Sequence, residues 1–268
     1  MGWGRVDFRR AGRLGGSSIA VVLALGPLGC AKAPSSAGTG TFLVVTMRFN
    51  GPVNGNYQYF ALFRNANDPA GQNGRIPVVE PPYLNGFATG QNTATAGFTD
   101  FVEYSLVQQV ATPSGYAVYH VNGGIAGDPN LRQFQARGEV DRGVSPQGGN
   151  TLEFEIDLSR LKPSPGEVDP NNGASPRYLQ FNLVATTTTP INPQTVDPAK
   201  VVDAIGDQRL GSGSFNTFVT IDTAQTGRVY QNSANPGDPT YEPEHDPYPS
   251  DRDPAVDLVA WTVQVQTR

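Results

Sequence analysis

A strict alternation of apolar and acidic residues at Thr151–Leu158 is the feature that most constrains the fold of this chain. Apolar side chains stand at every second position from Leu152 to Leu158, and Glu153, Glu155 and Asp157 fill the positions between them. Residues two apart share a face in a β-strand. The pattern therefore predicts a half-buried strand, and we expect it to pair with Gln133–Arg142 across residues 143–150.

Similar segments recur along the chain, separated by turns rich in Gly, Pro and Asn. Convincing helical periodicity is absent from the sequence, and Ser159–Lys162 and Pro198–Asp203 are the best candidates for short turns. About eleven strands predict an all-β fold, an antiparallel β-sandwich of the jelly-roll-like kind. We expect Thr41–Phe49 to form a hairpin with Tyr57–Phe63, and Phe215–Asp222 to pair with Arg228–Gln231. The remaining expected strands are Ile76–Val79, kept to an edge by Pro77, together with Phe98–Val107, Gly115–Val121, Arg177–Thr187 and Asp257–Gln266.

The N-terminal segment has the composition of an export leader. Four arginines precede the apolar run Ile19–Leu28, which is followed by Gly29 and Cys30. A basic region, a short apolar region and a small-residue cleavage site are typical of a secretory signal. The run is about ten residues long, half of the roughly twenty that a membrane-spanning helix needs. We therefore expect a processed leader rather than a permanent membrane span.

Leu28-Gly29-Cys30 resembles the cleavage box of bacterial lipoprotein signal peptides, with Pro27 where that family usually has Leu. The resemblance implies that Cys30 carries a lipid, and Ala31 after it implies the outer membrane in a cell with two membranes. Cys30 is also the only cysteine, so no intramolecular disulfide is possible, and a thioether to lipid would remove an exposed thiol that is prone to oxidation. An ordinary signal peptide cleaved nearby is the alternative.

These features divide the chain into a signal peptide (1–29), a lipidated cysteine with a Gly/Ser-type tether (30–41) and one sandwich domain (42–268). Removing residues 1–29 leaves 15 basic and 23 acidic side chains, a net charge near −8. Without a basic cluster to neutralise phosphates, nucleic acid is not expected as a partner. An anionic membrane surface would repel the domain, so the expected link to the membrane of the cell envelope is the lipid on Cys30.

Part of the domain is similar to DOMON-like and related carbohydrate-binding β-sandwiches. The similarity covers the succession Thr151–Leu161, Tyr178–Val184 and Val201–Asp207, in which a strand ends in a short turn and the next strand bears Phe-Asn. It implies a sugar-binding or haem-binding module. The haem version fits poorly, because neither His120 nor Met47 has a ligand partner of known position.

Tyr83 and Phe87 are the candidate ligand-binding residues. They lie in the loop Glu80–Phe87, which Pro81 and Pro82 stiffen, and aromatic rings on a stiff loop can stack on the apolar face of a sugar. A polysaccharide is therefore the expected ligand. The alternative is that the rings plug the end of the sandwich.

The acidic residues of two neighbouring expected strands allow two interpretations. Glu139 and Asp141 on one strand, with Glu153, Glu155 and Asp157 on its neighbour, could supply the paired carboxylates of a glycan-acting hydrolase. The same residues suit the solvent face of an edge hairpin, where like charges prevent edge-to-edge pairing.

The segment Asp238–Asp257 holds seven carboxylates and a single arginine, and its prolines prevent a helix. Calcium, which takes six to eight oxygen ligands, would relieve the repulsion, and the candidate ligands are Asp246, Asp251, Asp253 and Asp257. A solvated acidic loop is the alternative.

No other catalytic pattern emerges from the sequence. The two histidines, His120 and His245, have no zinc-like spacing, and neither a Gly-x-Ser-x-Gly elbow nor a phosphate-binding loop occurs. His120 ends the segment Tyr116–His120, where we expect it to be structural. The sequence therefore favours a non-enzymatic, ligand-binding or structural envelope lipoprotein without a required cofactor.

Overall fold

The computed structural model describes residues 39–70, 76–78, 97–106, 112–122, 133–163, 165–187, 201–206, 217–243 and 253–268. By its internal contacts the chain divides into Met1–Pro34 and Ser35–Arg268, and all of the strands belong to the second unit. The predicted leader and Cys30 lie outside the described residues.

The alternating segment forms β7 (Thr151–Asp157), as predicted. Leu152, Phe154 and Ile156 are buried, whereas Glu153 and Asp157 are partly exposed. The strand continues into a single turn of 3-10 helix, η2 (Leu158–Leu161), where Asp157 caps the first turn by accepting a hydrogen bond from the Ser159 amide.

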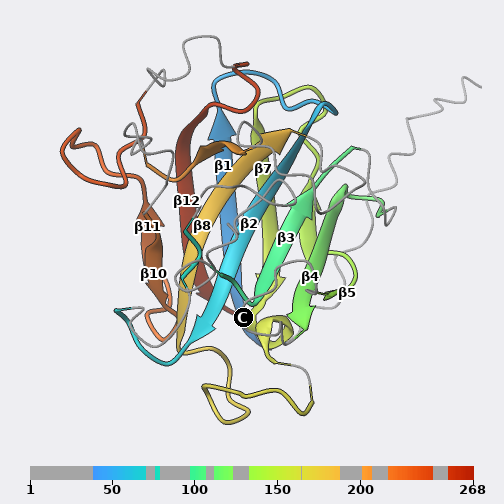
Figure 1. The fold of residues 1–268 in the computed structure, drawn as a ribbon, viewed down its shortest axis with the longest axis vertical. Helices are drawn as coiled ribbons and strands as arrows, with labels where there is room; N and C mark the ends of the chain where they lie inside the picture. The colour runs from blue at the N-terminus through green and yellow to red at the C-terminus, as the bar shows by residue number, and fades with distance from the viewer. Residues whose placement is uncertain are drawn as a thin grey trace, which may run out of the picture. The chain divides into compact units, whose positions relative to one another are not determined.

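Two antiparallel sheets are built from the strands of the described residues, and the predicted all-β sandwich is confirmed. A five-stranded sheet has the order β11-β12-β1-β7-β6. A seven-stranded sheet has the order β10-β8-β2-β3-β4-β5, with β9 also paired to β8. In addition to β7, the strands are β1 (Thr41–Phe49), β2 (Tyr57–Ala66), β3 (Asp100–Tyr104), β4 (Tyr116–Asn122), β5 (Gln133–Ala136), β6 (Arg142–Val144), β8 (Tyr178–Thr187), β9 (Val201–Ala204), β10 (Val219–Asp222), β11 (Val229–Gln231) and β12 (Leu258–Thr267) (Figure 1).

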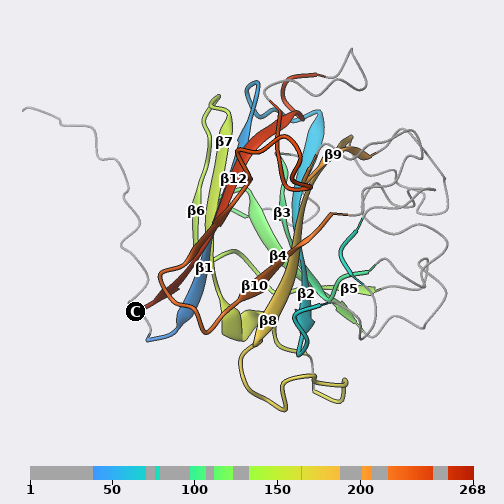
Figure 2. The ribbon, with the colours of Figure 1, turned by 90° about the vertical axis from the view of Figure 1, so that its left-hand side faces the viewer.

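The main core lies between the two sheets, which Figure 2 shows edge-on. β1 and β12 contribute Leu43 and Trp261 from one side, and β2 and β8 contribute Phe63 and Phe181 from the other. The rings of Phe181 and Trp261 approach to 6.3 Å between centroids. Each of these four side chains is at most 2% exposed, so inward-facing residues of both sheets share one apolar layer.

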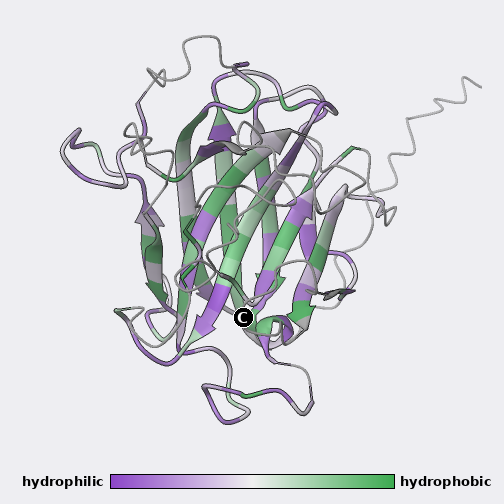
Figure 3. Cartoon of the chain, in the orientation of Figure 1, coloured by the Kyte–Doolittle hydropathy of each residue, from purple (hydrophilic) through white to green (hydrophobic). Residues whose placement is uncertain are grey.

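A second apolar cluster covers the outer face of the seven-stranded sheet. Hydrophobic residues run without interruption through the middle of β2 (Figure 3), the pattern of a strand that is buried on both faces. Phe60 and Leu62 point outward from β2, and Phe101 stacks on Tyr119 beside them at 4.8 Å between ring centroids. The two sheets therefore differ, because the outer face of the five-stranded sheet carries mostly polar side chains.

The predicted hairpin of β1 and β2 is wrong, because the two strands belong to different sheets. Within the connection, the Gly51 amide donates to the Pro254 carbonyl at 2.7 Å and the Val53 amide donates to the Gly149 carbonyl at 3.0 Å. These bonds carry the chain across the end of the sandwich. A side chain at position 51 would lie 2.7 Å from Pro254 Cβ, so this crossing requires glycine.

The predicted pairing of Phe215–Asp222 with Arg228–Gln231 is also wrong. β10 pairs with β8 in one sheet, whereas β11 pairs with β12 in the other. The two strands occupy edges of opposite sheets, and the Tyr230 hydroxyl accepts a hydrogen bond from the Asp222 amide at 2.9 Å between them.

Residues 133–142 do not form the single strand that was predicted. β5 pairs with β4 in the seven-stranded sheet, and β6 pairs with β7 in the five-stranded sheet. Gly138 turns the chain at φ +86° between them, and Val140 is buried in the core. The acidic residues Glu139 and Asp141 therefore lie on the crossing.

Three short segments differ in how well they match their predicted structure. The turn at Ser159–Lys162 is confirmed by η2, but the helical turn expected at Pro198–Asp203 is wrong in its described part, where β9 begins at Val201. Residues 76–78, from the expected edge strand Ile76–Val79, form no strand of either sheet.

Candidate functional site

The predicted sites are only partly within the described residues. Cys30, Tyr83, Phe87, Asp246 and Asp251 lie outside them. Asp253 and Asp257 of the calcium hypothesis are described, and so are all of the carboxylates of the hydrolase alternative.

The two ends of the segment that carries Tyr83 and Phe87 are fixed close together. The Gly97 amide donates to the Ile76 carbonyl at 2.7 Å. Next to it, the buried Asn182 side chain of β8 donates to the Pro77 carbonyl at 2.7 Å. Asn182 pairs with Leu62, and Phe98 belongs to the outer apolar cluster. The described residues on either side of residues 79–96 are therefore both held at the outer face of the seven-stranded sheet.

A carboxylate with a strongly shifted pKa lies on this same face. Glu103 of β3 points outward like Phe101, and the side-chain amide of Gln58 donates to its Oε1 at 3.0 Å. Burial raises the pKa of Glu103 to about 7. Burial, followed by the charge of Glu103, raises the pKa of nearby Tyr119 to about 12. Aromatic rings and a carboxylate–amide pair are thus side by side on one sheet face.

The carboxylates of Asp253 and Asp257 both accept hydrogen bonds from other residues of the chain. The Asp253 carboxylate accepts hydrogen bonds from the Ala255 amide at 2.9 Å and from the Tyr57 hydroxyl at 3.0 Å. Burial, followed by the hydrogen bond and charge of Asp253, raises the pKa of Tyr57. Asp257 is 5% exposed, and its Oδ2 accepts from the side-chain amide of Asn50 at 3.0 Å. These two carboxylates tie the start of β12 to the connection between β1 and β2.

No group of three or more His, Cys, Asp or Glu residues is placed to hold a metal ion among the residues that the structure describes. The calcium hypothesis depends on Asp246 and Asp251 and stays a prediction.

Most of the carboxylates around β6 and β7 accept hydrogen bonds from other residues of the chain. Glu139 accepts from the Ser114 amide at 2.7 Å, and Asp141 accepts from the Asp157 amide at 2.7 Å. Glu153 and Glu155 project from the same strand, two residues apart. Glycosidases need two carboxyl groups on opposite sides of the scissile bond, an arrangement that these two same-strand residues do not make.

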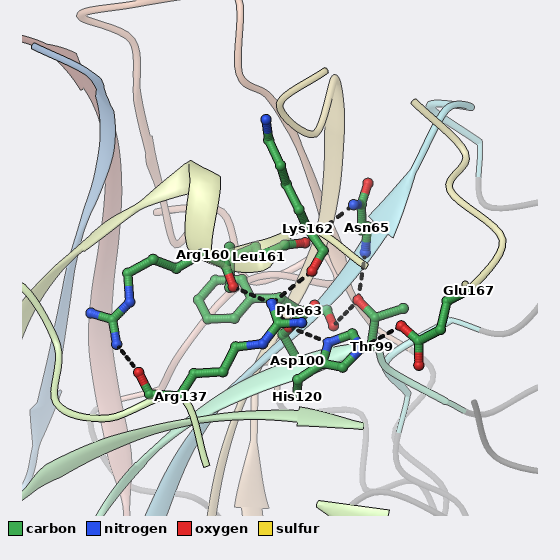
Figure 4. A network of polar contacts seen from close by, with 10 residues as sticks. All are labelled: Phe63, Asn65, Thr99, Asp100, His120, Arg137, Arg160, Leu161, Lys162 and Glu167. Carbon is green, nitrogen blue, oxygen red and sulfur yellow. Dashed lines mark hydrogen bonds and ion pairs between the residues drawn. The ribbon is translucent and has the colours of Figure 1, made fainter. Parts of the chain in front are cut away.

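A buried polar network at one end of the sandwich was not predicted. His120 of β4 is 2% exposed. Its Nδ1 lies 2.8 Å from Asp100 Oδ1, and its Nε2 lies 2.7 Å from Glu167 Oε2 (Figure 4). The antiparallel register places Asp100 directly opposite His120, so β3 and β4 position the first contact and residues 165–176 supply the second.

Charge balance decides the protonation of this network. A neutral imidazole has one N–H, yet both ring nitrogens of His120 face carboxylate oxygens. Burial acts to lower the pKa of His120, but the hydrogen bond and charge of Asp100, and then Glu167, outweigh burial and raise that pKa. Burial raises the pKa of Asp100 in spite of His120. In the native state, His120 and Asp100 therefore keep a bound proton up to a higher pH than the same two groups would in the unfolded chain.

The same network closes the end of the sandwich. Arg137 Nη1 lies 3.5 Å from Asp100 Oδ1 and donates to the carbonyls of Arg160 and Lys162. Asn65 of β2 donates to the Leu161 carbonyl at 3.2 Å. An aspartate can orient a histidine that acts as a general base. The other ring nitrogen of that histidine must then face the nucleophile. Because the Glu167 carboxylate faces that nitrogen of His120, the contacts favour a structural role for the network.

Sequence reasoning anticipated a structural His120 but not its partners. The turn at residues 112–115 predicted that the flanking strands are adjacent, and their register would have brought Asp100 opposite His120. Glu167 had no local signal, because it lies outside any strand.

No family model, no curated protein and no solved structure matches this chain. Among the described residues, no helix has the length and apolar character required to cross a membrane.

Proposed function

We propose that this protein is a lipid-anchored protein of the cell envelope whose β-sandwich binds a polysaccharide without cleaving it. The observation that carries the ligand proposal is the base of residues 79–96, fixed by the Gly97–Ile76 hydrogen bond on the outer face of the seven-stranded sheet. Gly97, the first described residue after the segment that carries Tyr83 and Phe87, therefore lies next to Phe98, whose ring contacts Phe101.

Nearby groups suit a sugar. Phe134 at this face is 39% exposed and contacts Phe101 edge-on at 5.2 Å between ring centroids. Glu103 and Gln58 offer a carboxylate and an amide, which can bond to sugar hydroxyls. Rings for stacking with a few polar groups for orientation are the usual composition of a saccharide site.

The anchor proposal depends on Cys30 and on where the tether joins the domain. The Gly40 amide donates to the Arg268 carbonyl at 3.1 Å, and the Arg268 amide donates to the Gly40 carbonyl at the same distance. Gly40, near the end of the expected tether, therefore lies beside the C-terminal strand. An extended tether of this length reaches roughly 35 Å, which leaves the domain close to the membrane.

A glycan array probed with the full chain in detergent tests the ligand. We expect binding of a polysaccharide that the double variant Tyr83→Ala, Phe87→Ala weakens at least tenfold at unchanged thermal stability. Val229→Ala, which removes an exposed apolar side chain from the opposite sheet, is the matched control and should bind normally. Wild-type affinity in the double variant would exclude this site, and release of reducing ends from the bound glycan would favour the hydrolase alternative.

Intact-mass measurement tests the anchor separately. The membrane-extracted protein should begin at Cys30 and carry added acyl mass, whereas Cys30→Ser should remain an unacylated precursor. A wild-type mass without acyl addition would reject the anchor.

Thermal melts test the calcium hypothesis. A site that includes Asp246, Asp251, Asp253 and Asp257 predicts a higher melting temperature in calcium than in chelator, because calcium would bind only the native state. Superimposable curves at low salt would leave a solvated acidic loop.

A further inference from the structure

A pocket of about 240 Å³ opens on the outer face of the five-stranded sheet, on the opposite side of the sandwich from the base of residues 79–96. It lies over β6, β7, β1 and β12 and is smaller than the roughly 300–1,000 Å³ typical of drug-sized ligands. Its main lining residues are Val44, Arg142, Val144, Glu153, Glu155 and Arg268.

One ion pair forms the fixed part of the pocket. Glu155 is only 5% exposed, and its two oxygens accept hydrogen bonds from Arg268 Nη1 and Nη2 at 2.7 and 2.6 Å. The Arg268 guanidinium also lies over the Phe42 ring, 5.4 Å from its centroid. A bidentate pair of this kind satisfies its own charges and holds its geometry.

Two opposite charges in the same pocket are left without such a partner. Arg142 lies opposite Glu155, and Glu153 lies opposite Val144 in the β6–β7 register. Within the described ranges, neither the Arg142 nor the Glu153 side chain makes a hydrogen bond or ion pair with another side chain. Glu155, the direct neighbour of Arg142, is already bonded to Arg268.

We propose that this pocket binds a small dipolar molecule that carries both a carboxylate and an ammonium group, namely a free amino acid or the end of a short peptide. The carboxylate would accept from the Arg142 guanidinium, and the ammonium would donate to the Glu153 carboxylate. Val44 and Val144, the latter 42% exposed, offer apolar contact to an aliphatic side chain.

Charge explains why a dipolar ligand fits better than a simple ion or a sugar. The two arginines and two glutamates of the pocket sum to zero, so either a lone anion or a lone cation meets repulsion as well as attraction. Hydrogen bonds between charged groups are about twice as strong as those between neutral groups. A ligand with both charges satisfies Arg142 and Glu153 together, which neutral hydroxyls do less well. This activity is independent of the proposed polysaccharide site.

Ligand-observed saturation-transfer NMR on the full chain in detergent tests the site, with leucine as the probe. We expect saturation of the leucine methyl groups in the wild-type protein. Arg142→Gln and Glu153→Gln should each reduce the affinity at least tenfold. Arg48→Gln alters an exposed arginine on the same face but outside the pocket, and should bind leucine normally.

Two modified probes separate the dipolar ligand from other occupants. N-acetyl-leucine lacks the ammonium and leucinamide lacks the carboxylate, so both should bind at least tenfold more weakly than leucine. Equal binding of either modified probe, unchanged binding in both variants, or no saturation of leucine would overturn the proposal. Near-ultraviolet circular dichroism of each variant should match the wild type, so that lost binding reports the pocket and not unfolding.

Discussion

At the scale of single residues, several charged or titratable side chains that the sequence pattern would place in solvent are buried and bonded to other residues. Glu155 alternates with apolar residues as a solvated carboxylate would, yet it is buried and bonded to Arg268. His120 is the clearest case, because both ring nitrogens meet carboxylates inside the sandwich. A buried charge is tolerated only with such partners.

Replacing His120 should destabilise the protein strongly. His120→Ala removes the closest charged partner of Asp100, and removing one member of a buried ion pair costs about 3–5 kcal/mol. Urea unfolding at pH 6 measures the loss. Lys162→Ala, at a partly exposed position in the same region, should cost less than about 1 kcal/mol and serves as the control. If His120→Ala also lowered the free energy of unfolding by less than about 1 kcal/mol, the network would contribute little to stability.

The same network predicts a fall in stability as the pH rises. The pKa of His120 and the pKa of Asp100 are both raised in the native state, so the native state binds more protons than the unfolded state. Stability from His120 is then complete below its unfolded pKa of about 6.5 and is lost as the pH rises through the higher native value.

Unfolding free energies between pH 5.5 and 9 measure this dependence. Glu103, with its pKa of about 7, contributes in the same direction, so Glu103→Gln is compared in parallel with His120→Gln. We expect each variant to flatten part of the slope. A wild-type stability that rises over this range would contradict the assignment.

At the scale of elements, one tyrosine joins strands of the two sheets. The hydroxyl of Tyr116, on β4, donates to the Val144 carbonyl of β6 at 3.0 Å and accepts from the Glu153 amide of β7 at 3.0 Å. Its ring also lies close to Gly143, where a Cβ atom would approach Tyr116 Cδ2 to 2.6 Å. The short strand β6 is therefore aligned by a contact from the opposite sheet.

Tyr116→Phe should cost about 1–3 kcal/mol, because two backbone groups lose a buried partner. Chemical denaturation compares it with Tyr178→Phe, whose hydroxyl makes no hydrogen bond to the described residues. We also expect faster amide hydrogen exchange at Glu153 in Tyr116→Phe. Equal stability of the two variants would mean that water replaces the lost bonds.

At the scale of the whole molecule, the sandwich lies within one unit of the chain. The division falls between Pro34 and Ser35, and β1 begins at Thr41 between β7 and β12 in its sheet. β1 supplies Leu43, Val45 and Met47 to the core. The fold should therefore need β1 but not the residues before Ser35.

Truncation tests this division. A chain that begins at Ser35 should unfold cooperatively with the same denaturation midpoint as the full chain. A chain that begins at Thr46 lacks half of the strand in the middle of a sheet, and it should show no cooperative transition. A lower midpoint for the Ser35 chain would show that the leader region contributes to the domain.

The sequence by itself determined where most of the strands lie and which of their faces are apolar. β7, β8 and β12 match their predicted segments to within one residue at each end, because a two-residue period and the turns that bound it are local properties. The export leader and the candidate lipid site on Cys30 are likewise predicted from local composition alone.

Only the tertiary structure decided how the strands are arranged and which polar groups meet. Turn residues specify where the chain reverses, but they do not specify whether the next strand pairs with the last one or crosses to the other sheet. For β1 and β2, and again for β10 and β11, it crosses. The contact of His120 with Glu167 and that of Glu155 with Arg268 join residues 47 and 113 positions apart. Such pairs follow from the packing of both sheets around one core, which no local pattern records.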